Sequence, residues 1–222
     1  MNYEQMNNNK AYLRGKIVTK PVFSHEVFDE KFYEFNLEVP RLSESFDTIP
    51  VTISERLIDD NINVGAVLTF LGQFRSYNKQ MDGKSKLVLT VFVREILKND
   101  DTQNPNVIEL NGFICKNPVF RTTPFKREIC DILLAVNRAY NKSDYIPCIA
   151  WGRNARFVKE LKVGEQLNLV GRIQSRLYQK KLSDDVIETK SAYEISITKI
   201  ISSDNTYSYL NNYNNENRNY IS

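Results

Sequence analysis

Flat aromatic rings and basic side chains occur together in the second half of the sequence. Arg172, Arg176 and Tyr178 fall on alternate positions of one apolar stretch, and Tyr145 and Trp151 flank another. A ring can stack on an unpaired nucleobase, and a guanidinium can bind a phosphate. These two groups are what a protein needs to hold a single strand of nucleic acid, so the pattern indicates binding chemistry.

Catalytic and metal-binding chemistry has little support in the same sequence. The chain has one histidine, His25, and its three cysteines (Cys115, Cys130 and Cys148) show no CxxC spacing. It contains no GxxxxGK[ST] loop and no GxSxG elbow. We therefore expect no enzyme activity, no cofactor and no metal, and we interpret the cysteines as buried free thiols in a reducing cytoplasm.

The net charge of +3 conceals an uneven distribution along the chain. Residues 1–98 carry 13 Lys and Arg against 13 Asp and Glu, whereas residues 106–181 carry 14 against 6. Basic charge that is concentrated in one half and interleaved with aromatic residues is typical of proteins that bind polyanions. The charge distribution therefore points to the second half as the better binder.

The chain also contains an internal repeat. An offset of 97 residues aligns the two halves, and one two-residue shift extends the match. The matched pairs include Leu13 with Leu110, Gly15 with Gly112, Pro21 with Pro118, Val39 with Val136, and Gly72 with Gly171. The repeat predicts two domains, 11–98 and 107–201, joined by a polar linker at 99–106. The Asn-rich and Tyr-rich segment 202–222 is expected to be disordered.

Within each repeat the apolar residues alternate, which predicts strands. The expected strands lie near 12–18, 31–40, 48–53, 67–76 and 87–97, and again near 107–116, 127–138, 145–151, 167–177 and 191–201. A short helix is expected near 54–62 and another near 153–161. Five strands with a helix between the third and the fourth is the OB-fold order. The predicted fold is all-β with short helices, as two tandem five-stranded OB-fold barrels.

Alternation also separates core positions from surface positions. In the second repeat it places Tyr145, Trp151 and Tyr178 on the outer surface beside Arg172 and Arg176. Arg138 shares the inward parity but stands at a strand end, where it can leave the core.

In the first repeat alternation exposes Arg75 and Tyr77, and Lys79 follows on the same face. That repeat also presents Glu34 and Glu38, and Ser54 stands where the second repeat has Trp151. We expect the first barrel to bind weakly or to serve assembly.

The second repeat contains an ordered series of short motifs: the turn Pro118-Val119-Phe120-Arg121, then Leu134-Ala135-Val136-Asn137-Arg138, Ala150-Trp151-Gly152-Arg153, Val163-Gly164 and Gly171-Arg172. Through these motifs the stretch 132–181 resembles the bacterial single-stranded DNA-binding protein family. The resemblance implies that Tyr140, Tyr145, Trp151 and Tyr178 stack on bases. The resemblance and the parity together give the expected contacts: Tyr140, Tyr145, Trp151, Tyr178, Arg121, Arg138, Arg153, Arg172, Arg176 and Lys180, with Arg75, Tyr77 and Lys79 from the first repeat.

The resemblance further implies sequence-independent binding and protection of single-stranded DNA in replication, recombination or repair, and a homodimer with four OB folds. The family's acidic tip, which recruits other proteins, has no match in the final residues, so that recruitment is in doubt. Pro50 and Pro147 predict a bulge or an edge in the third strands.

Two other classes of OB-fold protein stay open. One binds RNA or tRNA, and the other binds an oligosaccharide or a protein. The first ten residues are polar and the apolar runs are short, so we expect no secretory signal and no membrane segment. The expected location is the cytoplasm, in association with the nucleoid.

Overall fold

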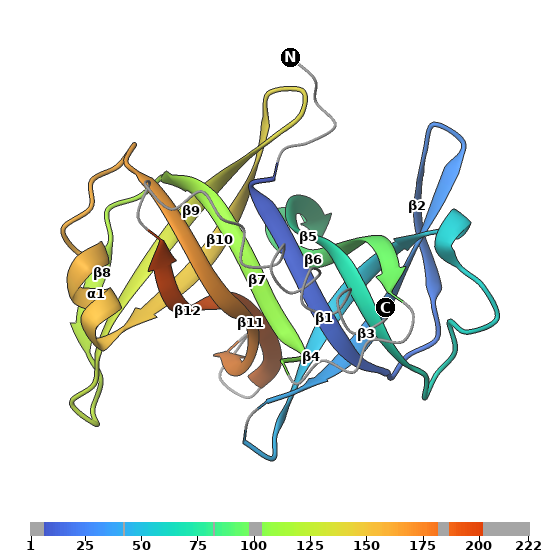
Figure 1. The fold of residues 1–222 in the computed structure, drawn as a ribbon, viewed down its shortest axis with the longest axis horizontal. Helices are drawn as coiled ribbons and strands as arrows, with labels where there is room; N and C mark the ends of the chain where they lie inside the picture. The colour runs from blue at the N-terminus through green and yellow to red at the C-terminus, as the bar shows by residue number, and fades with distance from the viewer. Residues whose placement is uncertain (1–6, 42, 82, 98–103, 182–186, 202–222) are drawn as a thin grey trace, which may run out of the picture.

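The computed structural model describes residues 7–41, 43–81, 83–97, 104–181 and 187–201. These residues form two β-barrels that lie side by side (Figure 1). The first contains β1 (Asn9–Ile17), β2 (Val22–Val27), β3 (Glu30–Pro40), β4 (Phe46–Ser54), the 3₁₀ turn η2 (Glu55–Leu57), β5 (Val67–Met81) and β6 (Lys84–Leu97). The second contains β7 (Asn106–Ile114), β8 (Val119–Thr122), β9 (Glu128–Arg138), β10 (Lys142–Trp151), α1 (Gly152–Val158), β11 (Gln166–Lys181) and β12 (Ile187–Ile201).

Each barrel closes in the same way. In the first, β1 pairs with β5 on one side and with β3 on the other, and in the second, β7 pairs with β11 and with β9. The short strands β2 and β8 extend β3 and β9 outward. The all-β fold of two tandem five-stranded barrels is therefore confirmed.

The barrel cores contain the residues that alternation predicts. Ile146, Cys148 and Ala150 of β10 point inward and are buried, as are Leu167 and Leu169 of β11. Burial of a large aliphatic side chain contributes about 1.5–3 kcal/mol. Cys130 is buried with Cys148, while Cys115 is only half-buried, so the expected full burial of all three thiols is wrong for Cys115.

The helix predicted near 54–62 is wrong in extent. In this range only Glu55–Leu57 is helical. Ser54 caps the start of the turn, and the turn ends at Ile58, whose backbone is extended. The backbone N–H of Asn61 then donates to Asp59 Oδ1, a local bond that competes with helix formation. The second helix, α1, ends at Val158 rather than at Leu161.

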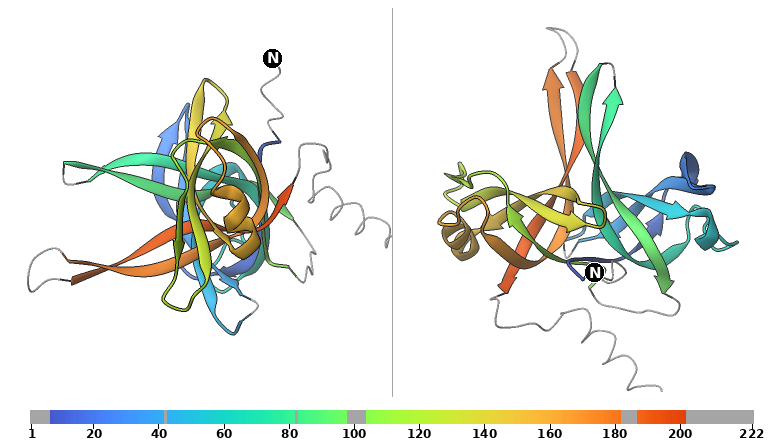
Figure 2. Two further views of the ribbon diagram at one scale, coloured as in Figure 1. Left: turned by 90° about the vertical axis from the view of Figure 1, so that its left-hand side faces the viewer. Right: turned by 90° about the horizontal axis from the view of Figure 1, so that it is seen from above.

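Two other features of the chain were not predicted. Strands β2 and β8 have no buried residue and therefore show no apolar alternation. The hairpins β5–β6 and β11–β12 run beyond the barrels as two long arms (Figure 2). Their outer parts are polar and exposed, so apolar periodicity ends before the strands do.

The third strands run without a bulge through their prolines. Pro50 pairs with Asn36 and Pro147 with Leu133 in unbroken registers, so the predicted bulge is wrong. On the other side of each strand the pairing is brief. Strand β4 pairs with β6 only at Val51 and Thr52, and this short edge tolerates a residue without an N–H group.

The two barrels are joined through their first strands. β1 and β7 pair antiparallel, with Ala11 opposite Ile108. These two residues are equivalent in the repeat, since they differ by the offset of 97. An approximate two-fold axis therefore passes between them and relates the barrels.

Side chains near the junction repeat this symmetry. Within the first barrel the Asn9 side chain bonds both backbone groups of Phe74 at 2.8 and 2.9 Å, and within the second Asn106 does the same with Ile173. Two further bonds cross between the barrels. Asp47 accepts from the backbone N–H of Ser175, and Asp144 from that of Ser76, each at 2.7 Å. The duplication thus built an interface as well as two domains.

Candidate nucleic-acid interface

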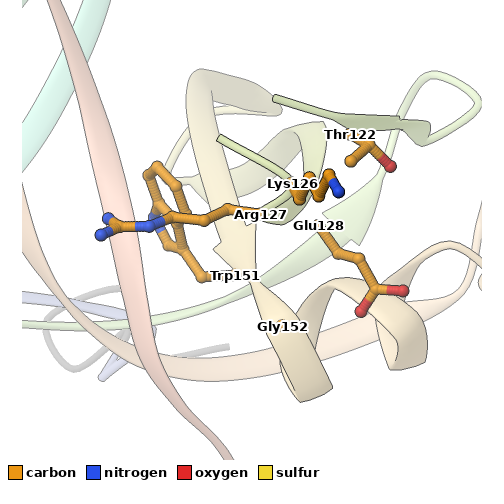
Figure 3. A pocket seen from close by; sticks show the side chains of 6 residues that line it. All are labelled: Thr122, Lys126, Arg127, Glu128, Trp151 and Gly152. Carbon is orange, nitrogen blue, oxygen red and sulfur yellow. The ribbon is translucent and has the colours of Figure 1, made fainter. Parts of the chain in front are cut away.

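Trp151 lies at the end of β10 with its ring partly exposed. The next residue, Gly152, has φ +52°, a conformation that turns the chain sharply into α1. The ring is 39% exposed, so the predicted outward orientation is confirmed. It lines a shallow depression with Thr122, Lys126, Arg127 and Glu128 of the β8–β9 hairpin (Figure 3).

Arg127 places a cation beside the indole. In Figure 3 its side chain runs past the Trp151 ring, and Lys126 lies on the same hairpin. A base stacked on the ring would bring its phosphate within reach of these cations. Sequence reasoning missed both residues because they lie in a turn, where alternation gives no orientation.

The other predicted aromatic residues are also on the surface. Tyr140 occupies the β9–β10 turn in a left-handed conformation, φ +61°, and is 85% exposed. Tyr145 and Tyr178 are partly exposed on β10 and β11. A role in stacking stays a prediction for all four rings.

Three of the arginines predicted in the second repeat have carboxylate partners. Arg121 pairs with Asp131 at 2.8 Å, Arg138 with Asp144 at 3.2 Å and Arg176 with Glu194 at 3.7 Å. Burial raises the pKa of Glu194, which Arg176 lowers in part. These three guanidinium groups therefore already have a carboxylate partner, which a phosphate would have to compete with or displace.

Arg172 lies apart from the tryptophan. It lines a small pocket at the barrel junction with Arg41, Asp47 and Asn106. The sequence analysis placed Arg172 beside Trp151 on one surface, but the two residues line different pockets. Arg153 is exposed on α1, and Lys180 lies in β11, with its side chain outside the described residues.

A second groove lies on the first barrel. It encloses about 660 Å³ and contains the three predicted first-repeat residues, Arg75, Tyr77 and Lys79. Its wall also includes His25, Phe32, Phe92 and Arg94, and Arg138 enters from the second barrel. Of these residues, the sequence analysis predicted only Arg138 and missed His25, Phe32, Phe92 and Arg94. Alternation around the apolar Val91 and Val93 would have predicted Phe92 and Arg94 on the outer face.

Burial and neighbouring charges shift the pKa of several side chains in and beside this groove. Burial and the neighbouring Arg138 lower the pKa of Arg75 to about 10. Asp144, whose side chain is fully buried, lies 3.2 Å from Arg138 and 4.0 Å from Arg75. Burial raises the pKa of this carboxyl group despite the two arginines. Tyr77 donates to Glu34 at 3.2 Å, and burial together with that carboxylate raises the tyrosine pKa to about 12.

The described residues provide no alternative chemistry in the form of a metal centre. No three His, Cys, Asp or Glu side chains among them gather in a way that could hold an ion. None of the helices in the described ranges is long and apolar enough to cross a membrane.

Known proteins resemble the second barrel in sequence. Residues 105–202 match the single-strand binding protein family. Single-stranded DNA-binding protein A of Bacillus subtilis is 33% identical over 92 residues, which are 38% of this chain and 54% of that protein. Single-stranded DNA-binding protein 1 of Staphylococcus aureus is also 33% identical over 92 residues, 55% of its length. The chain thus spans about half the length of these relatives.

The solved structures match both barrels. The single-stranded DNA-binding protein of Thermus aquaticus superposes on 90% of this chain and 95% of its own, with a TM-score of 0.64 and 16% identity. A deletion mutant of that protein gives a TM-score of 0.65 at 18% identity. At this identity the likeness establishes the tandem fold.

Proposed function

We propose that this chain, whose residues 105–202 belong to the single-strand binding protein family, binds single-stranded DNA without strong sequence preference. The observation that carries the proposal is the partly exposed Trp151 ring with Arg127 and Lys126 beside it. A ring stacks on any base, so this geometry favours unpaired strands and reads little sequence. The role is binding and protection of DNA in replication, recombination or repair, without catalysis, in the cytoplasm and on the nucleoid.

Trp151 is the single tryptophan, which makes the test direct. Oligo-dT should quench its emission at low salt, and a duplex of the same length should compete poorly. Equal competition by duplex, or no quenching, would contradict the proposal. Oligo-U is the comparison for the RNA-binding alternative, and stronger binding of oligo-U than of oligo-dT would favour that alternative.

We further propose a homodimer that presents four barrels. The support is apolar surface at both ends of the twelve-stranded sheet, where the described edge strands expose Val22, Phe23 and Val119. Exposed apolar edges of this kind are suited to association. Light scattering at micromolar concentration should give twice the monomer mass, and a monomer mass would contradict the proposal.

A further inference from the structure

The groove on the first barrel collects more cationic groups than its carboxylates balance. Arg75, Arg94 and Arg138 line it, and Lys79 lies on the same wall. Among the described residues, Asp144 is the carboxylate within 4 Å of Arg75 and Arg138, and none is that close to Arg94. Glu34 is engaged by Tyr77 and Ser24, the latter at 2.7 Å, and Glu30 acts on Arg94 at longer range. Like charges crowded in a half-buried groove are unfavourable unless an anion binds between them.

The arginines are held in place before any ligand binds. The Phe92 ring lies under both guanidinium groups, with Arg75 Cζ at 5.6 Å and Arg94 Cζ at 5.0 Å from its centroid. Gln73 Oε1 accepts from both arginines, from Arg94 at 3.2 Å. A guanidinium has five N–H donors in a fork that fits phosphate, so these partners leave donors for a ligand.

An aromatic ledge lines the same groove. His25 and Phe32 stack with centroids 5.0 Å apart and planes 15° apart, and Phe32 in turn contacts Phe92. Tyr77 is partly exposed on the neighbouring arm. Rings beside cations match the base and the phosphate of a nucleotide.

From this arrangement we infer a second nucleotide-binding site, on the first barrel, that takes the phosphate between Arg75, Arg94 and Arg138. The base would lie on the exposed ring of His25, which stacks on the buried Phe32. The inference rests on the proposed binding of single-stranded DNA and adds to it. It makes the first barrel a binding domain in its own right. Arg138, which the sequence assigns to the second barrel, becomes part of this site.

The site is not a copy of one in the second barrel. By strand register, Gln174 stands where the first barrel has Arg75, Ser196 where it has Phe92, and Thr198 where it has Arg94. Arg94 lies in a β-bulge of the β5–β6 hairpin, a feature that redirects a side chain. The first barrel therefore acquired cations and a ring that its partner lacks.

Two reporters can be placed in the full chain. The natural protein reports on the second barrel through Trp151, and the double variant Trp151→Phe, Phe92→Trp reports on the groove. Oligo-dT should quench both reporters. Quenching of the natural protein without any response of the double variant would overturn the second site. A lack of response in both would instead contradict the proposed function.

A charge variant tests the same site without moving the fluorophore. Arg94→Ala should weaken oligo-dT binding and reduce the slope of log affinity against log salt by about 0.7, the value of one phosphate contact on a single strand. Lys16→Ala, on the exposed face of β1, is the matched control and should leave the slope unchanged. An unchanged slope for Arg94→Ala would overturn the inference. So would a poly-glutamate peptide that perturbs the reporter at position 92 when oligo-dT does not, because the groove would then fit an acidic protein.

Discussion

The indole of Trp151 is half covered by the protein and half open, and this division separates its contribution to binding from its contribution to folding. Trp151→Ala should weaken oligo-dT binding by about 1–3 kcal/mol, the value of one base–aromatic stack. The melting temperature should fall little, because full burial is what makes loss of an aromatic ring costly. Filter binding and thermal melts on the same preparations measure both.

Arg127 offers the contrasting change at the same place. Arg127→Ala should lower the salt slope by about 0.7, whereas Trp151→Ala should leave it unchanged, because a neutral ring displaces no counterions. The result that contradicts this assignment is a Trp151→Ala protein that unfolds while Arg127→Ala keeps its full salt slope. The indole of Trp151 would then stabilise the fold by packing against the core rather than bind a base.

Asp144 gives a pH-dependent prediction. Burial raises the pKa of this carboxyl group in the folded protein, so the folded state holds the proton more tightly than the unfolded chain does. Its contribution to stability is complete below the ordinary aspartate pKa of about 4 and is lost as the pH rises through the raised value. Relative to Asp144→Asn, which cannot titrate, the natural protein should therefore lose stability as the pH rises above about 4.

Urea unfolding of both proteins across that pH range measures the difference. Asp131→Asn, in an exposed ion pair with Arg121, is the control. It keeps Asp144, so its stability should fall with rising pH in parallel with that of the natural protein. Parallel stability curves for the natural protein and Asp144→Asn would contradict the prediction.

Side-chain orientation was predictable wherever a strand has one buried face. Trp151 and the inward residues of β10 follow from alternation alone. The partners of the arginines did not follow, because Asp131, Asp144 and Glu194 reach Arg121, Arg138 and Arg176 through strand pairing that a single sequence does not reveal. The groove residue Arg138 is the clearest case, since it crosses from one repeat to the other.

At the scale of elements, the glycines of the repeat mark where each barrel closes. A Cβ on Gly15 would lie 2.5 Å from the backbone oxygen of Glu38, and one on Gly112 would lie 2.6 Å from that of Ala135. Both contacts join the first strand of a barrel, β1 or β7, to the strand that closes it, β3 or β9. Only a residue without a side chain permits this approach.

Gly15→Ala should therefore destabilise the first barrel by about 1–3 kcal/mol, the usual cost of overpacking. Chemical denaturation followed by circular dichroism gives the value. Lys16→Ala, one position further along β1 and exposed, should be nearly neutral. If Gly15→Ala and Lys16→Ala were equally stable, the close approach of β1 to β3 at Gly15 would not be needed to close the barrel.

The ten barrel strands were predictable because each alternates around a core. Strands β2 and β8, the outer arms and the short η2 turn were not. Strands β2 and β8 and the outer arms have no buried face. The η2 turn is short because local hydrogen bonds to Ser54 and Asp59 compete with a longer helix, which the apolar residues of 54–62 had predicted.

For the whole molecule, the repeat predicted two domains but not their junction. The pairing of β1 with β7 covers an edge that each barrel would otherwise expose. A fragment that begins at the linker and contains only the second barrel would leave unpaired the edge of β7 that β1 covers.

Such a fragment should pair with itself. Because Ala11 is the repeat equivalent of Ile108, replacement of β1 by a second β7 puts Ile108 opposite Ile108 on the two-fold axis. Light scattering of the fragment should give twice its monomer mass. A monomeric fragment would show that the β1–β7 pairing is not self-complementary.

The two-fold relation also has a consequence for direction. A DNA strand has a 5′ end and a 3′ end, and an asymmetric surface binds it in one polarity. Rotation about the two-fold axis between Ala11 and Ile108 reverses every direction that is perpendicular to this axis. The same binding route therefore runs in opposite directions on the two barrels. A strand that follows the same route over both barrels must therefore turn back on itself between them, and a strand too short to turn can follow that route on only one barrel at a time.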